Sequence, residues 1–320
     1  MIPPVAPLVK KCSPLFLLFL SKHPLPKRGT STLLKSVDMP RKRKTADVTS
    51  SANNGKGGFL MILSPAKTLD LSPMDIDKPI PWTKPECSLE KTKQVIQTMK
   101  GHAKSTGGLS KLLGISTTLA GTAKTYWDEM EEESDDATTV PKPCGFAFSG
   151  AAYKGLEINT MSKKSLVYLQ NSLRIIDPLY GWLRPMDTIQ PYRLEMATKN
   201  VFDDKSIKLN EYWKPAILES YANNDEGKII LNLASDEYAA AVDVPMVKIV
   251  FKHGSRVIAV HAKRARGLMV RYLAENNVSS LQEIHNFAEE GYMFQPQYSD
   301  DKTIVFDRPK EWKKPRTTKK

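Results

Sequence analysis

The chain has 320 residues, of which 41% are hydrophobic and 26% are charged, a composition that is ordinary for a globular protein. Its formal net charge of +12 favours polyanionic partners but gives no information about the fold. No apolar run approaches the roughly 20 residues that a membrane-spanning helix needs, so we expect neither a membrane span nor a membrane partner.

Cysteine and histidine usage argues against a disulfide framework and against a metal site. Cys12, Cys87 and Cys144 lie far apart and form no paired motif, which favours a reducing compartment. The five histidines are scattered, without the spacing of a metal site. We therefore expect no metal ligand and no cofactor, and direct iron binding is the weakest of the functional alternatives.

Residues 1–58 differ in composition from the rest of the chain, and we interpret them as a disordered basic extension or a targeting segment. The first acidic residue is Asp38, and a basic leader that is poor in acids resembles an organelle transit peptide. The cluster Arg41–Lys44 resembles a nuclear-localisation signal instead. A third alternative is an extension without any address, and Met39 could be an alternative start.

The predicted folded domain comprises residues 59–309, a length that fits one domain, and the basic residues 310–320 are expected to form a disordered tail. Short apolar runs predict strands, and longer amphipathic segments predict helices. The expected strands are 59–63, 144–148, 173–176, 228–233 and 303–306, with a hairpin of 247–251 and 257–261 about His253 and Gly254. The expected helices are 88–102, 163–173, 209–221, 263–276 and 279–287. This order predicts an α/β or mixed α+β domain in which helices surround a mixed sheet.

Residues 109–123 match much of the helix-hairpin-helix pattern, in which a tight turn between two helices presents backbone N–H groups to a nucleic-acid phosphate. Ser116 replaces the second glycine of the pattern, but it can cap the second helix and offer its hydroxyl to phosphate. The predicted DNA contacts are Lys111, Gly114, Ile115, Ser116 and Thr117. The alternative is two short core helices joined by a glycine turn. The acidic segment 128–136 would have to lie away from DNA.

The stretch 179–196 is irregular, because glycine and two prolines interrupt it, yet it is rich in aromatic and charged side chains. Such a segment is held against a core, with its charges paired or directed into a cleft. Arg184 and Arg193 need carboxylate partners if they are buried, and Asp187 and Glu195 are the nearest in sequence. Both a structural loop and a cleft lining fit this pattern.

Polar residues follow several of the predicted strands: Lys67, Ser149, Asp177 and Ser235. Ligands of α/β sheets bind outside the carboxyl ends of the strands, so we expect a cleft there. The basic helix 263–276 would border it, with Arg264, Gly267 and Arg271 on one face. The predicted DNA-binding side chains of this basic cleft are Lys67, Arg184, Arg193, Lys263, Arg264 and Arg271.

Six segments resemble, in order, the signature blocks of the YaaA peroxide-stress protein family, over about Phe59 to Arg308. They are Ile62–Asp70, Leu179–Asp187, Gln190–Met196, Asn232–Tyr238, Ala262–Met269 and Glu290–Tyr292. The resemblance implies a single compact α/β domain with a positively charged cleft and a helix-hairpin-helix element. It also implies a bacterial cytoplasmic protein that binds DNA and limits hydrogen peroxide damage through lower free intracellular iron. The basic extension, the acidic segment and the basic tail depart from the family.

Two classes of function remain. The first, which we prefer, is a monomeric peroxide-stress protein that binds duplex DNA through its phosphate backbone with little sequence preference. The second is an enzyme that acts on a nucleotide or a damaged base, with Asp187, Glu195 or Glu237 as acid or base beside the basic cleft. An enzyme needs a carboxylate with a raised pKa inside the cleft, whereas a binding protein needs only surface cations.

Overall fold

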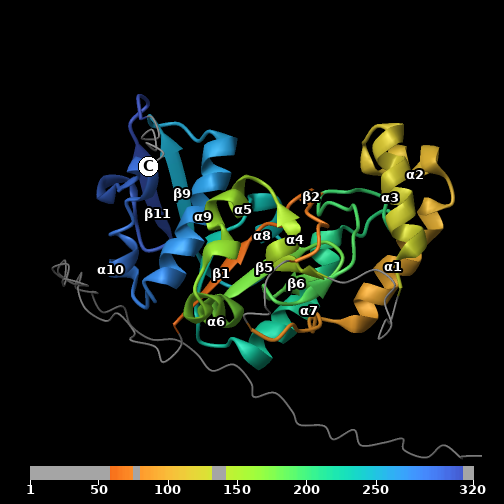
Figure 1. Ribbon diagram of the computed structural model, residues 1–320, viewed down its shortest axis with the longest axis horizontal. Helices are drawn as coiled ribbons and strands as arrows, with labels where there is room; N and C mark the ends of the chain where they lie inside the picture. The colour runs from red at the N-terminus through yellow and green to blue at the C-terminus, as the bar shows by residue number, and fades with distance from the viewer. Residues whose placement is uncertain (1–57, 75–79, 132–141, 313–320) are drawn as a thin grey trace, which may run out of the picture. The chain divides into compact units, whose positions relative to one another are not determined.

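The computed structural model describes residues 58–74, 80–131 and 142–312, which all belong to one compact unit (Figure 1). Several expectations lie outside these residues: the extension with its basic cluster Arg41–Lys44, the alternative start Met39, most of the acidic segment, and the tail after residue 312. The described part has the mixed α/β architecture that the sequence predicts.

A seven-stranded mixed sheet forms the centre, with the strand order β10-β11-β9-β8-β1-β5-β6. Its strands are β1 (Phe59–Leu63), β5 (Leu173–Asp177), β6 (Gly181–Leu183), β8 (Ile229–Leu233), β9 (Met246–His253), β10 (Met293–Phe294) and β11 (Thr303–Arg308). The inner strands from β11 to β5 are parallel, whereas the edge strands β10 and β6 are antiparallel to their neighbours. The carboxyl ends of all the parallel strands therefore meet at one edge of the sheet.

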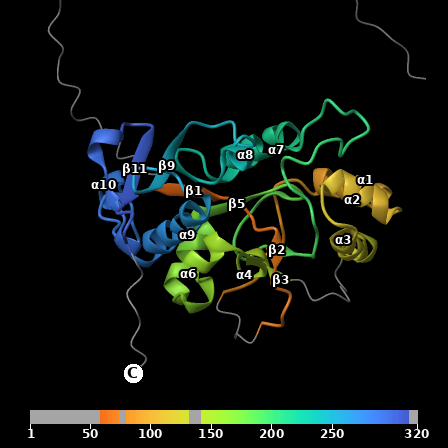
Figure 2. The same ribbon diagram turned by 90° about the horizontal axis from the view of Figure 1, so that it is seen from above.

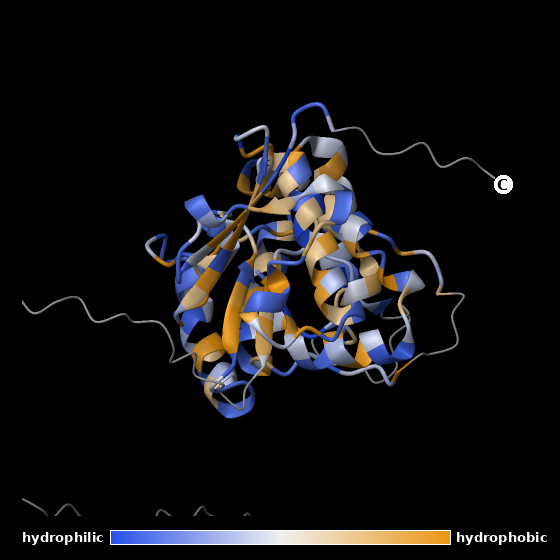
Figure 3. Cartoon of the chain, turned by 90° about the vertical axis from the view of Figure 1, so that its left-hand side faces the viewer, coloured by the Kyte–Doolittle hydropathy of each residue, from blue (hydrophilic) through white to orange (hydrophobic). Residues whose placement is uncertain are grey.

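Helices cover both faces of this sheet. Figure 2 shows α7 (Leu209–Asn224) and α8 (Asp236–Ala239) on one side, and α6 (Lys163–Ser172) and α9 (Ala259–Glu275) on the other. Every residue of β1 is buried, as expected for an uninterrupted apolar strand between two helical layers. Figure 3 shows that the strands are predominantly hydrophobic.

Three helices follow one another beyond the β6 end of the sheet: α1 (Leu89–Ala103), α2 (Thr106–Leu113) and α3 (Thr117–Glu129). In both Figure 1 and Figure 2 they lie opposite the end that carries β11 and α10 (Leu281–Ile284). Ser88 caps α1 by accepting a hydrogen bond from the Lys91 N–H at 3.3 Å. The Trp127 ring lies 6.3 Å from the Tyr192 ring, which connects α3 to the stretch 179–196.

Helices α5 (Ala151–Leu156) and α9 pack backbone against backbone. A methyl group added at Gly267 would lie 1.7 Å from the Ala152 carbonyl oxygen, and one at Gly155 would lie 2.3 Å from the Arg264 carbonyl oxygen. No side chain fits at either position, so only glycines allow the backbones of these two helices to touch. This contact places one face of α9 beside the start of α5.

Three expected elements differ in the structure. Residues 144–148 are not a strand but the short helix α4 (Cys144–Ala147) followed by β4 (Phe148–Ser149). The Cys144 and Gly145 N–H groups donate to the Asp187 and Pro185 carbonyl oxygens, which ties this segment to the stretch 179–196 rather than to the sheet. Helix α10 is four residues long instead of nine, because a capping box at Ser280 starts it late and a turn follows Ile284.

The expected hairpin at Gly254 is also absent. β9 pairs with β8 and β11, both parallel, so residues 257–261 have no free edge of β9 to join. They form the approach to α9 and its first turn instead. The remaining strands are β2 (Thr68–Leu69), which pairs with β4, and β3 (Lys142–Pro143), which pairs with β7 (Thr188–Ile189). Short 3-10 helices span Ile158–Thr160, Glu289–Gly291 and Pro296–Tyr298.

Gly267→Ala is expected to destabilise the protein strongly, because the added methyl group overlaps the Ala152 carbonyl oxygen and forces α5 and α9 apart. Overpacking typically costs about 1–3 kcal/mol, and an overlap with backbone atoms should lie at the upper end of that range. Gly121→Ala is the matched control, since Gly121 lies inside α3 and a methyl group there would meet nothing within 4 Å. The control should gain about 0.5–1 kcal/mol. Urea denaturation measures both changes, and equal stabilities would contradict the backbone contact.

Candidate functional site

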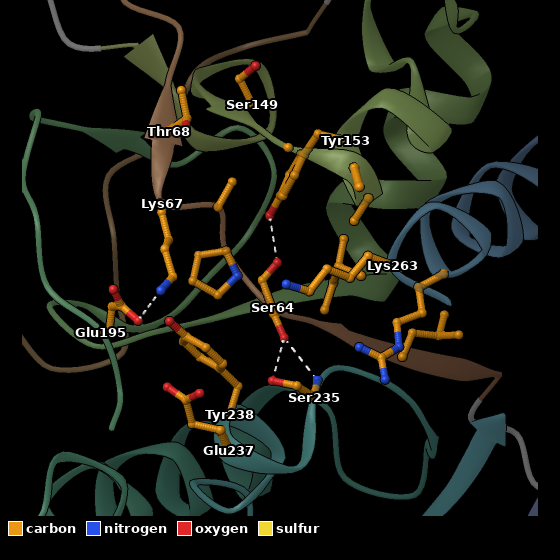
Figure 4. A pocket seen from close by; sticks show the side chains of 18 residues that line it. Ser64, Lys67, Thr68, Ser149, Tyr153, Glu195, Ser235, Glu237, Tyr238 and Lys263 are labelled. Atoms are coloured by element: carbon orange, nitrogen blue, oxygen red, sulfur yellow. Dashed lines mark hydrogen bonds and ion pairs between the residues drawn. The ribbon is translucent and has the colours of Figure 1, made fainter. Parts of the chain in front are cut away.

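The carboxyl ends of β1 and β8 open into a cavity of about 410 Å³, shown in Figure 4. Segments that are distant in sequence form its walls: the residues after β1, the start of α5, the loop at Glu195, the start of α8 and one face of α9. The polar and charged residues that line it are Ser64, Lys67, Thr68, Ser149, Tyr153, Glu195, Ser235, Glu237, Tyr238, Lys263 and Arg266. This is the edge of the sheet where the sequence predicts a ligand.

The floor of the pocket is a small hydrogen-bond network between the ends of β1 and β8. These strands are paired up to Leu63 and Leu233, so the residues that follow them emerge side by side. The Ser235 N–H donates to the Ser64 hydroxyl oxygen at 2.9 Å, and the two hydroxyl oxygens are 3.3 Å apart. Ser235 precedes α8 but makes no side-chain cap on it, since its hydroxyl lies against Ser64.

Charged side chains of both signs line the pocket. Lys67 forms an ion pair of 2.5 Å with Glu195, and Glu237 accepts a hydrogen bond from the Ala197 N–H at 2.9 Å. Figure 4 shows Lys67 and Lys263 entering from different walls. With Arg266 the pocket carries three cations and two carboxylates, so its lining is mixed in charge rather than uniformly basic.

The structure thus brings together only part of the predicted cleft. Lys67, Glu195, Glu237 and Lys263 line the pocket, together with the strand-terminal Ser149 and Ser235. Arg193 lies in an adjoining small hollow and donates to the Lys67 carbonyl oxygen at 3.3 Å. Its buried Nε atom has no hydrogen-bond partner among the described residues.

Arg184 and Asp187 lie outside this pocket, contrary to the expectation. They border a separate hollow with Arg174 and Glu86. The Asp187 carboxylate accepts bonds from the Arg184 main-chain N–H at 2.8 Å, from its guanidinium at 3.2 Å, and from the Thr83 hydroxyl at 2.5 Å. Burial raises the pKa of Asp187, although these donors oppose the shift. The pair holds the turn between β6 and β7. This part of the stretch 179–196 is therefore a structural loop rather than a lining of the cleft.

Arg264 and Arg271 are also absent from the pocket lining, because the face of α9 that carries them with Gly267 packs on α5. Arg264 donates to the Lys154 carbonyl oxygen at 2.8 Å and pairs with Glu290 at 2.7 Å. Arg271 donates to the Leu156 and Glu157 carbonyl oxygens, each at 3.1 Å. Both arginines therefore donate hydrogen bonds to the carbonyl oxygens that are left without a helical partner at the carboxyl-terminal end of α5.

Asp177, predicted to border the cleft, is fully buried and does not line the pocket. Its carboxylate accepts bonds from the Leu179 and Tyr180 N–H groups at 2.9 and 3.0 Å, and a short bond from the Tyr192 hydroxyl. Burial raises the pKa of Asp177 to about 6, and these hydrogen bonds limit the rise. The carboxyl groups with raised pKa values, Asp177 and Asp187, thus both lie outside the pocket lining.

Sequence reasoning missed five polar residues of the pocket: Ser64, Thr68, Tyr153, Tyr238 and Arg266. Two of them carried a usable signal. Ser64 directly follows a buried strand, and Arg266 stands three residues after Lys263 and so shares its side of α9. Tyr153, whose hydroxyl donates to the Ser64 carbonyl oxygen at 3.1 Å, gave no such signal because its position depends on the contact between α5 and α9.

The turn between α2 and α3 is a second, separate candidate, since neither helix contributes to the pocket lining. Gly114 has a left-handed φ of +62°, and its N–H donates to the Ser110 carbonyl oxygen. Ser116 caps α3, as predicted, by accepting a bond from the Leu119 N–H at 3.3 Å. Lys111, Gly114, Ser116 and Thr117 are exposed, and Ile115 is half-buried.

Two further properties concern the described residues as a whole. They contain no group of three or more histidine, cysteine, aspartate or glutamate side chains that could hold a metal ion. Within the same ranges, every helix is too short or too polar to cross a membrane.

Fold and pocket together define a mixed α/β protein with a charged pocket at the carboxyl edge of its sheet. The sequence model of the family described as "Peroxide stress protein YaaA" matches residues 59–298. A UPF0246 protein of Francisella tularensis subsp. novicida (strain U112) is 36% identical over 262 residues, which cover 78% of this chain and 100% of the relative. A UPF0246 protein of Marinomonas sp. (strain MWYL1) is 37% identical over 259 residues, covering 78% and 96%. The chain belongs to the YaaA peroxide stress protein family.

Arg184→Ala should cost about 3 kcal/mol of unfolding free energy, because it leaves the Asp187 carboxylate, only 2% exposed, without its cation. The double variant Arg184→Ala with Asp187→Asn removes that orphaned charge and should recover most of the loss. Urea denaturation of the two variants provides the comparison. If the single variant were as stable as the wild type, the pair would have no structural role.

Asp177→Asn is expected to change how stability depends on pH. The folded pKa of about 6 exceeds the ordinary aspartate pKa of 3.8, so the stability that Asp177 contributes is present below pH 3.8 and is lost as the pH rises through 6. The asparagine side chain has nearly the shape of aspartate but does not titrate in this pH range. Relative to the variant, the wild type should lose about 2 kcal/mol between pH 4 and pH 7. Parallel urea midpoints over this range would contradict the raised pKa.

Proposed function

We propose that this protein acts under peroxide stress by binding duplex DNA through its phosphate backbone, at the turn between α2 and α3. The observation that carries the proposal is the geometry of this turn: a left-handed Gly114 followed by an exposed Ser116 that caps α3. The same arrangement is what a helix-hairpin-helix element needs in order to bring its backbone close to a phosphate.

The first N–H groups of an α-helix have no acceptor within the helix. At the start of α3 the side chains of Ser116, Thr117 and Thr118 are all exposed, so an incoming phosphate would meet main-chain N–H groups and hydroxyls together. The first turn of α3 contains no acidic residue that would repel an anion. Lys111, exposed in the last turn of α2, adds a positive charge beside the turn.

Two further properties support the proposal. The family to which the chain belongs is described by its role in peroxide stress. The net charge of +12 favours a polyanion, and contacts to phosphates give affinity without reading the base sequence. We extend to this protein the lower free iron that the family resemblance implies. Cells that lack the protein should then show more free iron after peroxide treatment, as measured by electron paramagnetic resonance.

Ser116→Asp should weaken binding of a labelled duplex about tenfold at low salt, because its carboxylate would face the phosphate. Aspartate is a good helix cap, so folding should be preserved, and Ser116→Gly should bind DNA as well as the wild type. Ser162→Asp is the matched control, since Ser162 also caps a helix, α6, by accepting a bond from the Ser165 N–H. Fluorescence anisotropy over a series of salt concentrations measures all four proteins.

The wild-type affinity should also fall steeply as salt increases, in proportion to the phosphates that the protein neutralises. Because the control carries the same added charge on the same full chain, contributions from the basic ends of the protein cancel in the comparison. If Ser116→Asp bound DNA as tightly as Ser162→Asp, the turn would not be the phosphate contact. A flat salt dependence would contradict backbone binding altogether.

A further inference from the structure

Two cations on α9 line the pocket without an acidic partner. Lys263 and Arg266 are three residues apart and so lie on one side of the helix. Among the described residues, neither makes an ion pair or donates a hydrogen bond to the protein. Arg264 and Arg271, on the side that packs against α5, are both paired and hydrogen-bonded. Helix α9 thus leaves uncompensated only the positive charges that line the cavity.

The uncompensated charge of Arg266 is held in place by the fold. Its neighbour Gly267 is in backbone contact with Ala152, so this turn of α9 cannot move away from the pocket wall. Burial lowers the pKa of Arg266, and the charge of the Asp236 carboxylate, with which Arg266 forms no ion pair, opposes the shift. A half-buried guanidinium without a partner is unfavourable, and a bound anion would relieve that cost.

The rest of the pocket is suited to a small organic molecule. Pro65, Ala151, Ala152 and the Tyr153 and Tyr238 rings provide apolar wall. A volume of about 410 Å³ is within the range of small-molecule sites. Glu195 and Glu237 would repel the successive phosphates of a duplex but could receive polar donors of a single bound molecule. The pocket therefore differs from the α2–α3 turn in the kind of anion that it can accept.

We propose that this pocket binds a small organic phosphate of about the size of a nucleoside monophosphate, with its phosphate between Lys263 and Arg266. The planar guanidinium of Arg266 can donate two parallel hydrogen bonds to phosphate oxygens, and two cations match a phosphate dianion better than a single carboxylate. The organic part would lie towards the Tyr153 and Tyr238 rings and the two glutamates. This site is additional to the proposed DNA contact and does not depend on it.

Isothermal titration calorimetry on the full chain tests the proposal with AMP, inorganic phosphate, adenosine and acetate as probes. AMP should bind most tightly, inorganic phosphate should bind to the same site, and adenosine and acetate should each bind at least tenfold more weakly than AMP. Lys263→Gln and Arg266→Gln should each weaken AMP binding at least tenfold. Arg256→Gln and Lys164→Gln remove the same charges from exposed positions outside the pocket and should bind AMP as the wild type does.

Thermal unfolding separates a ligand contact from a structural role. Without ligand, Arg266→Gln should melt at the wild-type temperature or above it, because it removes an uncompensated charge. AMP should then raise the melting temperature of the wild type but not of the variant. A lower melting temperature of the ligand-free variant would make Arg266 structural and would overturn the proposal. Equal AMP affinity of variant and wild type, or no binding of either phosphate probe, would overturn it as well.

DNA binding of the same variants distinguishes this site from the proposed nucleic-acid contact. Arg266→Gln should retain duplex affinity, and Ser116→Asp should retain AMP affinity. If Arg266→Gln lost DNA and AMP together, the pocket would be part of the duplex-binding surface, and the small-molecule proposal would fail. If Ser116→Asp bound DNA normally while Arg266→Gln still lost only AMP, the DNA proposal would fail and the pocket proposal would stand.

Discussion

The buried carboxylate of Asp177 holds the irregular stretch 179–196 in its conformation. Asp177 ends β5, and its oxygens receive the N–H groups of the next residues and the hydroxyl of Tyr192. These bonds fix the turn between β5 and β6 and tie Tyr192, near the end of the stretch 179–196, to the end of β5. Arg193 and Glu195 reach the pocket side because Tyr192 is held in this way. Without these bonds, a segment interrupted by glycine and proline would have little local structure of its own.

Local signals in the sequence were sufficient for much of this architecture. The apolar runs of β1 and β8 and the serine caps of α1 and α3 follow from nearest neighbours along the chain. Pairings between distant segments could not be predicted from such neighbours. β9 resembles the first arm of a hairpin, but its second neighbour is β11, some fifty residues later in the chain. Whether Arg184 or Arg193 reaches the pocket depends on which way each residue faces, and their spacing alone cannot decide that.

Net charge gave an incomplete guide to the binding surface for a related reason. Several of the basic residues predicted to contact DNA are engaged within the protein: Arg184 with Asp187, and Arg264 and Arg271 with the end of α5. A further arginine, Arg174 of β5, forms a buried pair of 2.7 Å with Asp225. The informative cations are those that the fold leaves without a partner, and these can be identified only after the helices are placed.

The glycine contact between α5 and α9 also determines which parts of the pocket can adapt. Two helices that touch through their backbones have no side chains between them that could change rotamer, so they behave as one rigid wall. The facing side is different, because Lys67 and Glu195 are 61% and 26% exposed and stand on loops. A molecule entering the pocket would therefore meet one fixed surface that sets its position and one surface whose side chains can adjust to it. Two missing methyl groups produce this asymmetry.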